Sequence, residues 1–217
     1  FRREDLPGNL SLALGTANLT PMEIATGWAA FANGGYKIEP YLIERIDSRD
    51  GQQLFVANPR SVPGLTPLLP SSGVPSSESV PPSAEQIIDP RTSYILTSML
   101  QDVITRGTGR RALALQRADL AGKTGTTNES KDSWFSGYNA DLVTTVWSGF
   151  DQPASLGRNE YGGTVALPIW MSFMGEALKD RPQRLLPQPP GVVTLRVDPF
   201  SGRAATPGNP NAYFEVF

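Results

Sequence analysis

The chain contains no cysteine and no histidine among its 217 residues. Without cysteine it cannot form a disulfide scaffold, a thiolate zinc site or a thiol nucleophile. Without histidine it cannot hold a His-ligated metal or a Ser-His-Asp arrangement of its own. Acid or base chemistry within this chain therefore has to use lysine, tyrosine or a carboxylate. We expect no metal site and no cofactor.

The chain also lacks a strong net charge and a long apolar run. Its formal net charge is -2, which gives no electrostatic case for binding nucleic acid. No segment approaches the ~20 apolar residues that a membrane-spanning helix needs. Residues 1–5 do not resemble a signal peptide. We therefore expect any membrane anchor to lie outside this sequence.

Composition predicts a folded domain interrupted by loops. The chain is long enough for one sizeable core or two small ones, but it carries 20 prolines and 21 glycines. Proline, serine and glycine concentrate in residues 58–86, where no apolar periodicity is present. The predicted parts are the first part of a domain (1–57), a Pro/Ser-rich linker or long loop (58–88), the rest of the domain (89–185) and a C-terminal extension (186–217).

Local signals predict a first helix followed by short strands. Thr20 can cap the helix, Glu23 can complete a capping box and Pro21 suits the first helical position. The glycines at 34 and 35 end it. Beyond them, short strands are predicted at 36–39, 41–46 and 53–56, with a hairpin turn at 48–51.

Two further helices are predicted. One begins with Asp89 as cap and Pro90 at the first position, and it stops near Gly107. The other covers residues 168–178. The apolar side chains expected to face the core are Leu96, Met99, Leu100 and Val103 in the former, and Leu167, Trp170, Met171, Met174 and Leu178 in the latter.

Between these two helices the sequence predicts strands at 120–126, 133–138 and 142–150. Strands so close in sequence should pair antiparallel, and helices packed on the sheet make an α+β domain. Because 142–150 is the longest apolar candidate, we expect it at the centre, paired with 120–126. Residues 192–197 and 213–217 are possible edge strands.

The strand at 120–126 contains the most informative segment, Lys123-Thr124-Gly125-Thr126. Glycine weakens a strand, so Gly122 and Gly125 indicate a place where another group approaches the backbone closely. A β-bulge without a ligand is the structural alternative.

A phosphate-binding loop is a second alternative, because Gly122-Lys123-Thr124 matches the end of G-x-x-x-x-G-K-[ST]. That pattern requires glycine at position 117, where this chain has Arg117. The residues after Thr124 are also poor starts for the helix that would hold the phosphates. A nucleotide site is therefore disfavoured.

As one wall of a substrate groove the segment makes chemical sense. A strand edge can hold an extended peptide through main-chain hydrogen bonds. Lys123 supplies a point charge, and the hydroxyls of Thr124 and Thr126 can bind a carboxylate. Backbone N–H groups here can also face a developing oxyanion.

The segment resembles the Lys-Thr-Gly motif of the penicillin-binding serine transpeptidases, and the rest of the chain resembles their class A, bifunctional branch. The other matching segments are Leu14-Gly15-Thr16-Ala17, Thr20-Pro21-Met22-Glu23-Ile24-Ala25, Phe31-Ala32-Asn33-Gly34-Gly35, Arg106-Gly107-Thr108-Gly109, Asp132-Ser133-Trp134-Phe135-Ser136-Gly137-Tyr138 and Val146-Trp147-Ser148-Gly149-Phe150-Asp151. The resemblance implies the penicillin-binding/β-lactamase-like fold and places the Gly107-Thr108-Gly109 turn near the rim of the active site.

The resemblance also implies roles for the motif residues. Lys123 would be the catalytic motif lysine, which shapes the electrostatics and proton traffic of the site. Thr124, Gly125 and Thr126 would bind the substrate, with the two hydroxyls on its carboxylate. The Thr126 N–H would supply one half of the oxyanion hole.

The family takes its nucleophile from Ser-x-x-Lys and a second polar group from Ser-x-Asn, both upstream of Lys-Thr-Gly. Neither pattern occurs in this chain. The sequence is therefore interpreted as the C-terminal part of a larger enzyme, with the upstream part of the same protein as its first partner. The resemblance further implies stem peptides and β-lactams as ligands, a separate glycosyltransferase domain, and a location at the periplasmic face of the bacterial inner membrane. A non-catalytic sensor that holds peptide or β-lactam on the same wall remains the alternative.

Overall fold

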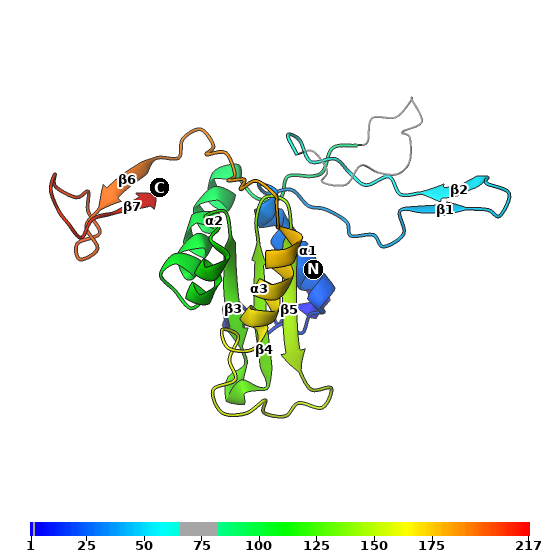
Figure 1. Cartoon of the computed structure of the whole chain (residues 1–217), viewed down its shortest axis with the longest axis horizontal. Helices are drawn as coiled ribbons and strands as arrows, with labels where there is room; N and C mark the ends of the chain where they lie inside the picture. The colour runs from blue at the N-terminus through cyan, green and yellow to red at the C-terminus, as the bar shows by residue number, and fades with distance from the viewer. Residues whose placement is uncertain (2, 66–81) are drawn as a thin grey trace.

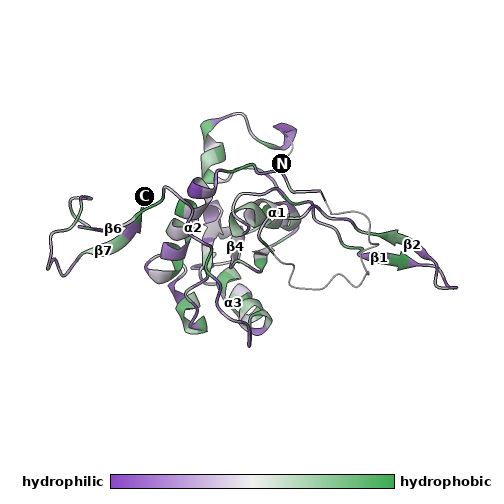
Figure 2. Cartoon of the chain, turned by 90° about the horizontal axis from the view of Figure 1, so that it is seen from above, coloured by the Kyte–Doolittle hydropathy of each residue, from purple (hydrophilic) through white to green (hydrophobic). Residues whose placement is uncertain are grey.

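The computed structural model describes residues 1, 3–65 and 82–217. Its centre is an antiparallel sheet with strand order β3-β4-β5, formed by Ala121–Thr126, Asp132–Tyr138 and Val143–Gly149. The helices are α1 (Pro21–Ala32), α2 (Pro90–Thr105) and α3 (Ala166–Ala177). Figures 1 and 2 show α1 and α3 on opposite faces of the sheet and α2 beside β3. This architecture confirms the predicted α+β class with an antiparallel sheet flanked by helices.

The strand order corrects one prediction. β3 pairs with β4, not with the strand that contains Trp147, and β4 takes the centre. Most of β4 is buried, whereas β5 is only partly buried along its length. A strand is central when other strands cover both of its edges and other elements cover both of its faces. Strand β4 is covered in this way, although β5 has the longer apolar run. β3 is therefore an edge strand of this sheet.

Each face of the sheet carries its own apolar core. The core on the α3 face contains Ile104, Ala112, Leu120, Phe135, Ala166, Leu167, Trp170, Met174 and Leu178. The core on the α1 face contains Ala32, Leu100, Ala121 and Tyr138, with Trp28 and Phe31 packed against it. Helix α2 contributes Leu100 to one core and Ile104 to the other, so it packs against both cores beside β3.

The helix caps agree with the local sequence. Thr20 and Glu23 form the predicted capping box, and Asp89 accepts a hydrogen bond from the Arg91 N–H at the start of α2. The buried face of α2 differs from the prediction, because Met99 is 56% exposed. Its place is taken by polar residues with partners: Ser93 donates to the Phe31 carbonyl, and Thr97 donates to the Ser93 carbonyl.

Two hairpins project from opposite sides of the sheet (Figure 1). One joins β1 (Arg45–Asp47) to β2 (Gln53–Val56), and the other joins β6 (Thr194–Val197) to β7 (Tyr213–Val216). The predicted strands at 36–39 and 41–46 were wrong, apart from the last two positions, which lie in β1. Tyr36 makes one isolated bridge with Gln86, and the residues between it and β1 have no strand partner in the described chain.

The remaining elements are short. Four 3-10 turns lie at Arg3–Asp5, Leu10–Leu14, Arg110–Leu115 and Asn128–Ser130. Residues 66–81, the centre of the predicted loop, lie outside the described residues. The described flanks of that loop contain isolated bridges, one of them between Ser61 and Ser83, and no helix.

Candidate active site

Strand β3 carries the candidate motif in regular β geometry. Its register with β4 runs without a shift from Ala121 opposite Tyr138 to Thr126 opposite Ser133. The bulge alternative is therefore wrong. The phosphate-loop alternative is also wrong. Lys123 lies within a strand, and the segment between β3 and β4 forms a single 3-10 turn in place of the helix that a phosphate loop requires.

The two motif glycines are packed against the neighbouring strand. A Cβ on Gly122 would lie 2.8 Å from the Phe135 ring, and one on Gly125 would lie 3.1 Å from the Trp134 Cβ. Side chains of strand β4 are therefore the groups that approach the backbone closely at these two glycines.

Alternation along β3 divides the motif between the two faces of the sheet. Thr124 lies opposite Phe135, whose ring packs on Trp170 of α3 at 4.9 Å between centroids. Thr124 and Thr126 therefore belong to the α3 face. Lys123 lies opposite Ser136 and belongs to the α1 face. Because β3 is an edge strand, both sets of side chains can reach the same open edge.

Lys123 is an exposed cation without a carboxylate partner in the described part of the chain. Its Nζ donates a hydrogen bond to the carbonyl oxygen of Thr124 at 2.9 Å. This contact is with its own backbone and leaves the positive charge uncompensated. A ligand anion at the β3 edge would find that charge available.

The two threonine hydroxyls already have partners from other segments. The Thr124 Oγ1 lies 2.9 Å from the Oγ1 of Thr108, which belongs to the turn after α2. The Thr126 Oγ1 accepts a hydrogen bond from the Gly162 N–H at 3.0 Å. Gly162 itself lies against the sheet, because a Cβ there would be 2.4 Å from the Trp134 carbonyl oxygen. The sequence predicts a turn at Thr108 but carries no local signal for the contact of Gly162.

Asp132 holds the chain that follows the motif. It accepts hydrogen bonds from the Trp147 indole N–H at 2.9 Å and from the Thr127 hydroxyl at 3.1 Å. Trp147 is 37% exposed at the sheet surface, whereas Phe135 and Trp170 are fully buried. These bonds link β5 to the residue that follows β3.

Tyr138 is the buried tyrosine of this region. Burial raises its pKa to about 12, although a hydrogen bond with Thr97 opposes that rise. The phenol oxygen lies 2.8 Å from the Thr97 hydroxyl. A group with such a pKa is a poor general base at neutral pH.

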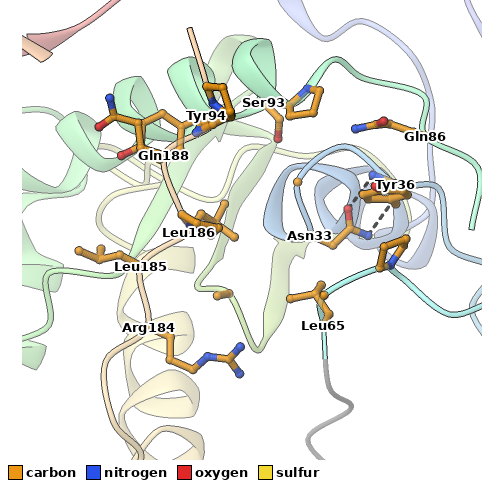
Figure 3. Close-up of a pocket in the computed structure, with 18 residues that line it drawn as sticks. Asn33, Tyr36, Leu65, Gln86, Ser93, Tyr94, Arg184, Leu185, Leu186 and Gln188 are labelled. Atoms are coloured by element: carbon orange, nitrogen blue, oxygen red, sulfur yellow. Dashed lines mark hydrogen bonds between the residues drawn. The ribbon is translucent and has the colours of Figure 1, made fainter. Parts of the chain in front are cut away.

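Two hollows of the described chain lie away from Lys123. A cavity of about 560 Å³ lies between the end of α1, the start of α2 and residues 184–190. Figure 3 shows Arg184, Leu185, Leu186 and Gln188 on one side of it and Asn33 with Tyr36 on the other. A second hollow of about 590 Å³ surrounds Arg117 and Gln183. Neither hollow is lined by a motif residue, and the motif itself lies on the edge strand β3.

The described residues contain no cluster of three or more acidic side chains suited to a metal ion. None of the helices among them has the length and apolarity needed to cross a membrane.

Comparison with known proteins agrees with the fold. A family model described as the penicillin binding protein transpeptidase domain matches residues 3–175. Penicillin-binding protein 1A of Pseudomonas aeruginosa is 59% identical over an alignment that covers all of this chain and 30% of that protein. Penicillin-binding protein 1A of Neisseria gonorrhoeae is 44% identical, with 89% of this chain and 22% of that protein covered.

A solved structure is similar as well. The crystal structure of penicillin-binding protein 1A from Haemophilus influenzae superposes with a TM-score of 0.86 at 35% identity, covering all of this chain and 34% of that one. The chain thus spans about a third or less of the length of these relatives. On the family match and on the identity to penicillin-binding protein 1A, this chain belongs to the penicillin-binding protein transpeptidase family.

Proposed function

We propose that this chain is the C-terminal portion of a peptidoglycan D,D-transpeptidase, which cross-links stem peptides by serine acyl transfer and is acylated by β-lactams. The observation that supports this proposal most strongly is the uncompensated charge of Lys123, which lies on an edge strand beside the hydroxyls of Thr124 and Thr126. The similarity to proteins named penicillin-binding protein 1A supports an enzyme over a sensor.

In this proposal β3 is one wall of the acyl-transfer site. The wall binds the stem peptide as a strand added along the edge of β3. The Thr124 and Thr126 hydroxyls bind the terminal carboxylate of the peptide. The positive charge of Lys123 attracts this carboxylate and stabilises the negative charge that develops in the transition state. The Thr126 N–H faces the oxyanion.

The nucleophile has to come from outside this sequence, because no serine here stands three residues before a lysine. A serine in the upstream part of the same protein attacks the peptide carbonyl. As the acyl-serine ester forms, the C–N bond breaks, and the departing amine takes up the proton that the serine hydroxyl has lost. An amine of a second stem peptide then attacks that ester and releases the serine. With a β-lactam, the ring amide bond breaks and the ester persists.

The division of the chain follows the same proposal. Residues 1–57 and 89–185 belong to the transpeptidase domain, 58–88 form a linker or long loop, and 186–217 form a C-terminal extension. The complete protein carries a separate glycosyltransferase domain. It works at the periplasmic face of the inner membrane, held by an anchor outside this chain.

The direct test replaces the motif lysine in the complete protein. Lys123→Ala should slow acylation by fluorescent penicillin at least ~100-fold, because the lost charge stabilises the transition state. Its thermal unfolding should match wild type, because Lys123 is exposed and packs against little. Lys131→Ala is the matched control, since Lys131 is a nearby surface lysine paired with Glu129 at 2.8 Å. Wild-type acylation by Lys123→Ala would refute the site assignment.

A further inference from the structure

The turn between α2 and the 3-10 segment Arg110–Leu115 brings Thr108 to the motif strand. The hydroxyl oxygens of Thr108 and Thr124 are 2.9 Å apart, although the two residues belong to different elements. The backbone of the turn is tightly held. A Cβ on Gly107 would lie 2.8 Å from the Val103 Cα, and the Gly109 N–H donates to the Val103 carbonyl at 2.8 Å.

The loop before α3 encloses the same turn from the other side. A Cβ on Gly163 would lie 3.2 Å from the Thr108 carbonyl oxygen. The next residue back, Gly162, donates its N–H to the Thr126 hydroxyl at 3.0 Å. Thr108 and Gly162 thus contact the two motif hydroxyls from two separate loops.

The Gly162 contact fixes the Thr126 hydroxyl as an acceptor, whereas either oxygen of the Thr108–Thr124 pair can be the donor. A hydroxyl has one proton and two lone pairs, and an ionised carboxylate only accepts hydrogen bonds. Thr126 receives the Gly162 N–H on a lone pair, so its proton remains free for a ligand. If Thr108 donates to Thr124 in the same way, the proton of Thr124 is also free. The pair of hydroxyls then acts as two donors toward an anion.

We propose that Thr108 is a positioning residue for carboxylate recognition: its hydroxyl donates to Thr124 and turns the Thr124 proton toward the ligand's carboxylate. This inference rests on the proposed function, because it assumes that Thr124 meets a substrate or β-lactam carboxylate. Thr108 acts through Thr124 and does not itself touch the reacting atoms. Loss of the Thr108 hydroxyl should therefore weaken binding of the ligand's carboxylate and leave the rate of the acylation step unchanged.

The experiment uses the complete protein with Thr108→Val, which removes the hydroxyl with little change of shape, and Thr108→Ser, which restores it. Acylation by a penicillin and by its methyl ester is followed over a range of concentrations, separating the initial Kd from the limiting acylation rate. For the free acid, Thr108→Val should raise the Kd about tenfold, as expected for one hydrogen bond to a charged group. The limiting rate should stay near wild type. The ester should respond much less, and Thr108→Ser should restore tight binding.

Two outcomes would overturn the proposal. An unchanged Kd for the free acid would show that the Thr108 hydroxyl does not orient Thr124. An equal loss for acid and ester, or a loss that Thr108→Ser does not repair, would show that Thr108 only supports the fold. Thermal unfolding identifies a variant that fails to fold, and Thr108→Ala then replaces Thr108→Val. Failure of the proposed function appears separately, as wild-type acylation by Lys123→Ala with both ligands.

Discussion

Asp119 shows how a single buried carboxylate fixes the start of the motif strand. Its side chain is fully buried and accepts both guanidinium hydrogen bonds from Arg117, at 2.9 and 2.7 Å. It also accepts from the Asn139 amide at 3.1 Å and from the Arg184 N–H at 3.0 Å. One residue therefore joins the beginning of β3, the turn between β4 and β5, and the segment after α3.

We predict that Asp119→Ala lowers the free energy of unfolding by about 3 kcal/mol, because it leaves the largely buried Arg117 without its charge partner. Denaturant unfolding of the wild type and the variant measures this difference. Asp151→Ala, at an exposed position, should change stability by less than about 0.5 kcal/mol. Equal effects of the two substitutions would show that the Asp119 contacts contribute nothing net.

The same residue predicts a pH dependence of stability. Burial raises the pKa of Asp119, but hydrogen bonds from Arg117, Arg184 and Asn139, together with the Arg117 charge, outweigh it and hold the pKa below its usual range. A carboxyl whose pKa is depressed by folding stabilises the protein above its unfolded pKa of about 3.9. That contribution is lost as the pH falls through the lower, folded pKa.

We therefore expect the stability difference between wild type and Asp119→Ala to be constant near neutral pH and to shrink below about pH 4. Unfolding curves at a series of pH values down to the acid transition test this. A difference that grows on acidification would contradict the assigned sign.

At the scale of elements, small residues in β4 let helix α3 approach the sheet. Trp170 of α3 is fully buried, and its indole N–H donates to the Gly137 carbonyl at 3.4 Å. A Cβ on Gly137 would lie 2.7 Å from the Trp170 ring and 2.9 Å from the Ala121 carbonyl oxygen. The contact between helix and sheet therefore depends on the absence of a side chain at this position.

Gly137→Ala should destabilise the protein by about 2 kcal/mol, because overpacking forces Trp170 or β3 to move. The near-UV circular dichroism of the tryptophans should change along with the unfolding midpoint. Gly8→Ala provides the control, since a Cβ there meets nothing within 4 Å. If both variants unfold alike, the packing between α3 and β4 is looser than these contacts require.

At the scale of the whole molecule, much apolar surface remains exposed. Figure 2 shows hydrophobic residues on both projecting hairpins. Leu54 and Phe55 of β2 are 61% and 46% exposed, and Phe214 of β7 is 70% exposed. An isolated two-stranded hairpin is marginal in water, and such patches favour association. We expect the 217-residue chain on its own to aggregate.

We also predict that the purified chain is not labelled covalently by fluorescent penicillin, because it contains no serine activated by a lysine three residues later. Labelling should appear when the upstream part of the protein is present. Gel fluorescence with mass spectrometry of the labelled peptide reports the outcome. Stoichiometric label on a serine of this chain would show that the nucleophile lies within it.

Much of the local structure could be predicted from sequence, since its causes lie within a few residues. Thr20 and Asp89 cap their helices through hydrogen bonds to N–H groups two or three positions away. The apolar stripe of α3 and the runs that form β3, β4 and β5 were predicted for the same reason, as was Lys123 on a strand. The site roles of Lys123 and of the residues up to Thr126 stay predictions.

Contacts between distant segments were decided only by the tertiary structure. β4 is the central strand because β3 and β5 pair with its two edges. Met99 is exposed, whereas Ser93 and Thr97 of the same helix are buried with hydrogen-bond partners. Thr108 and Gly162 reach the motif hydroxyls across 16 and 36 positions of sequence. A local pattern carries the preference of a segment for helix or strand, but hydrogen bonds across such distances depend on how all the elements pack together.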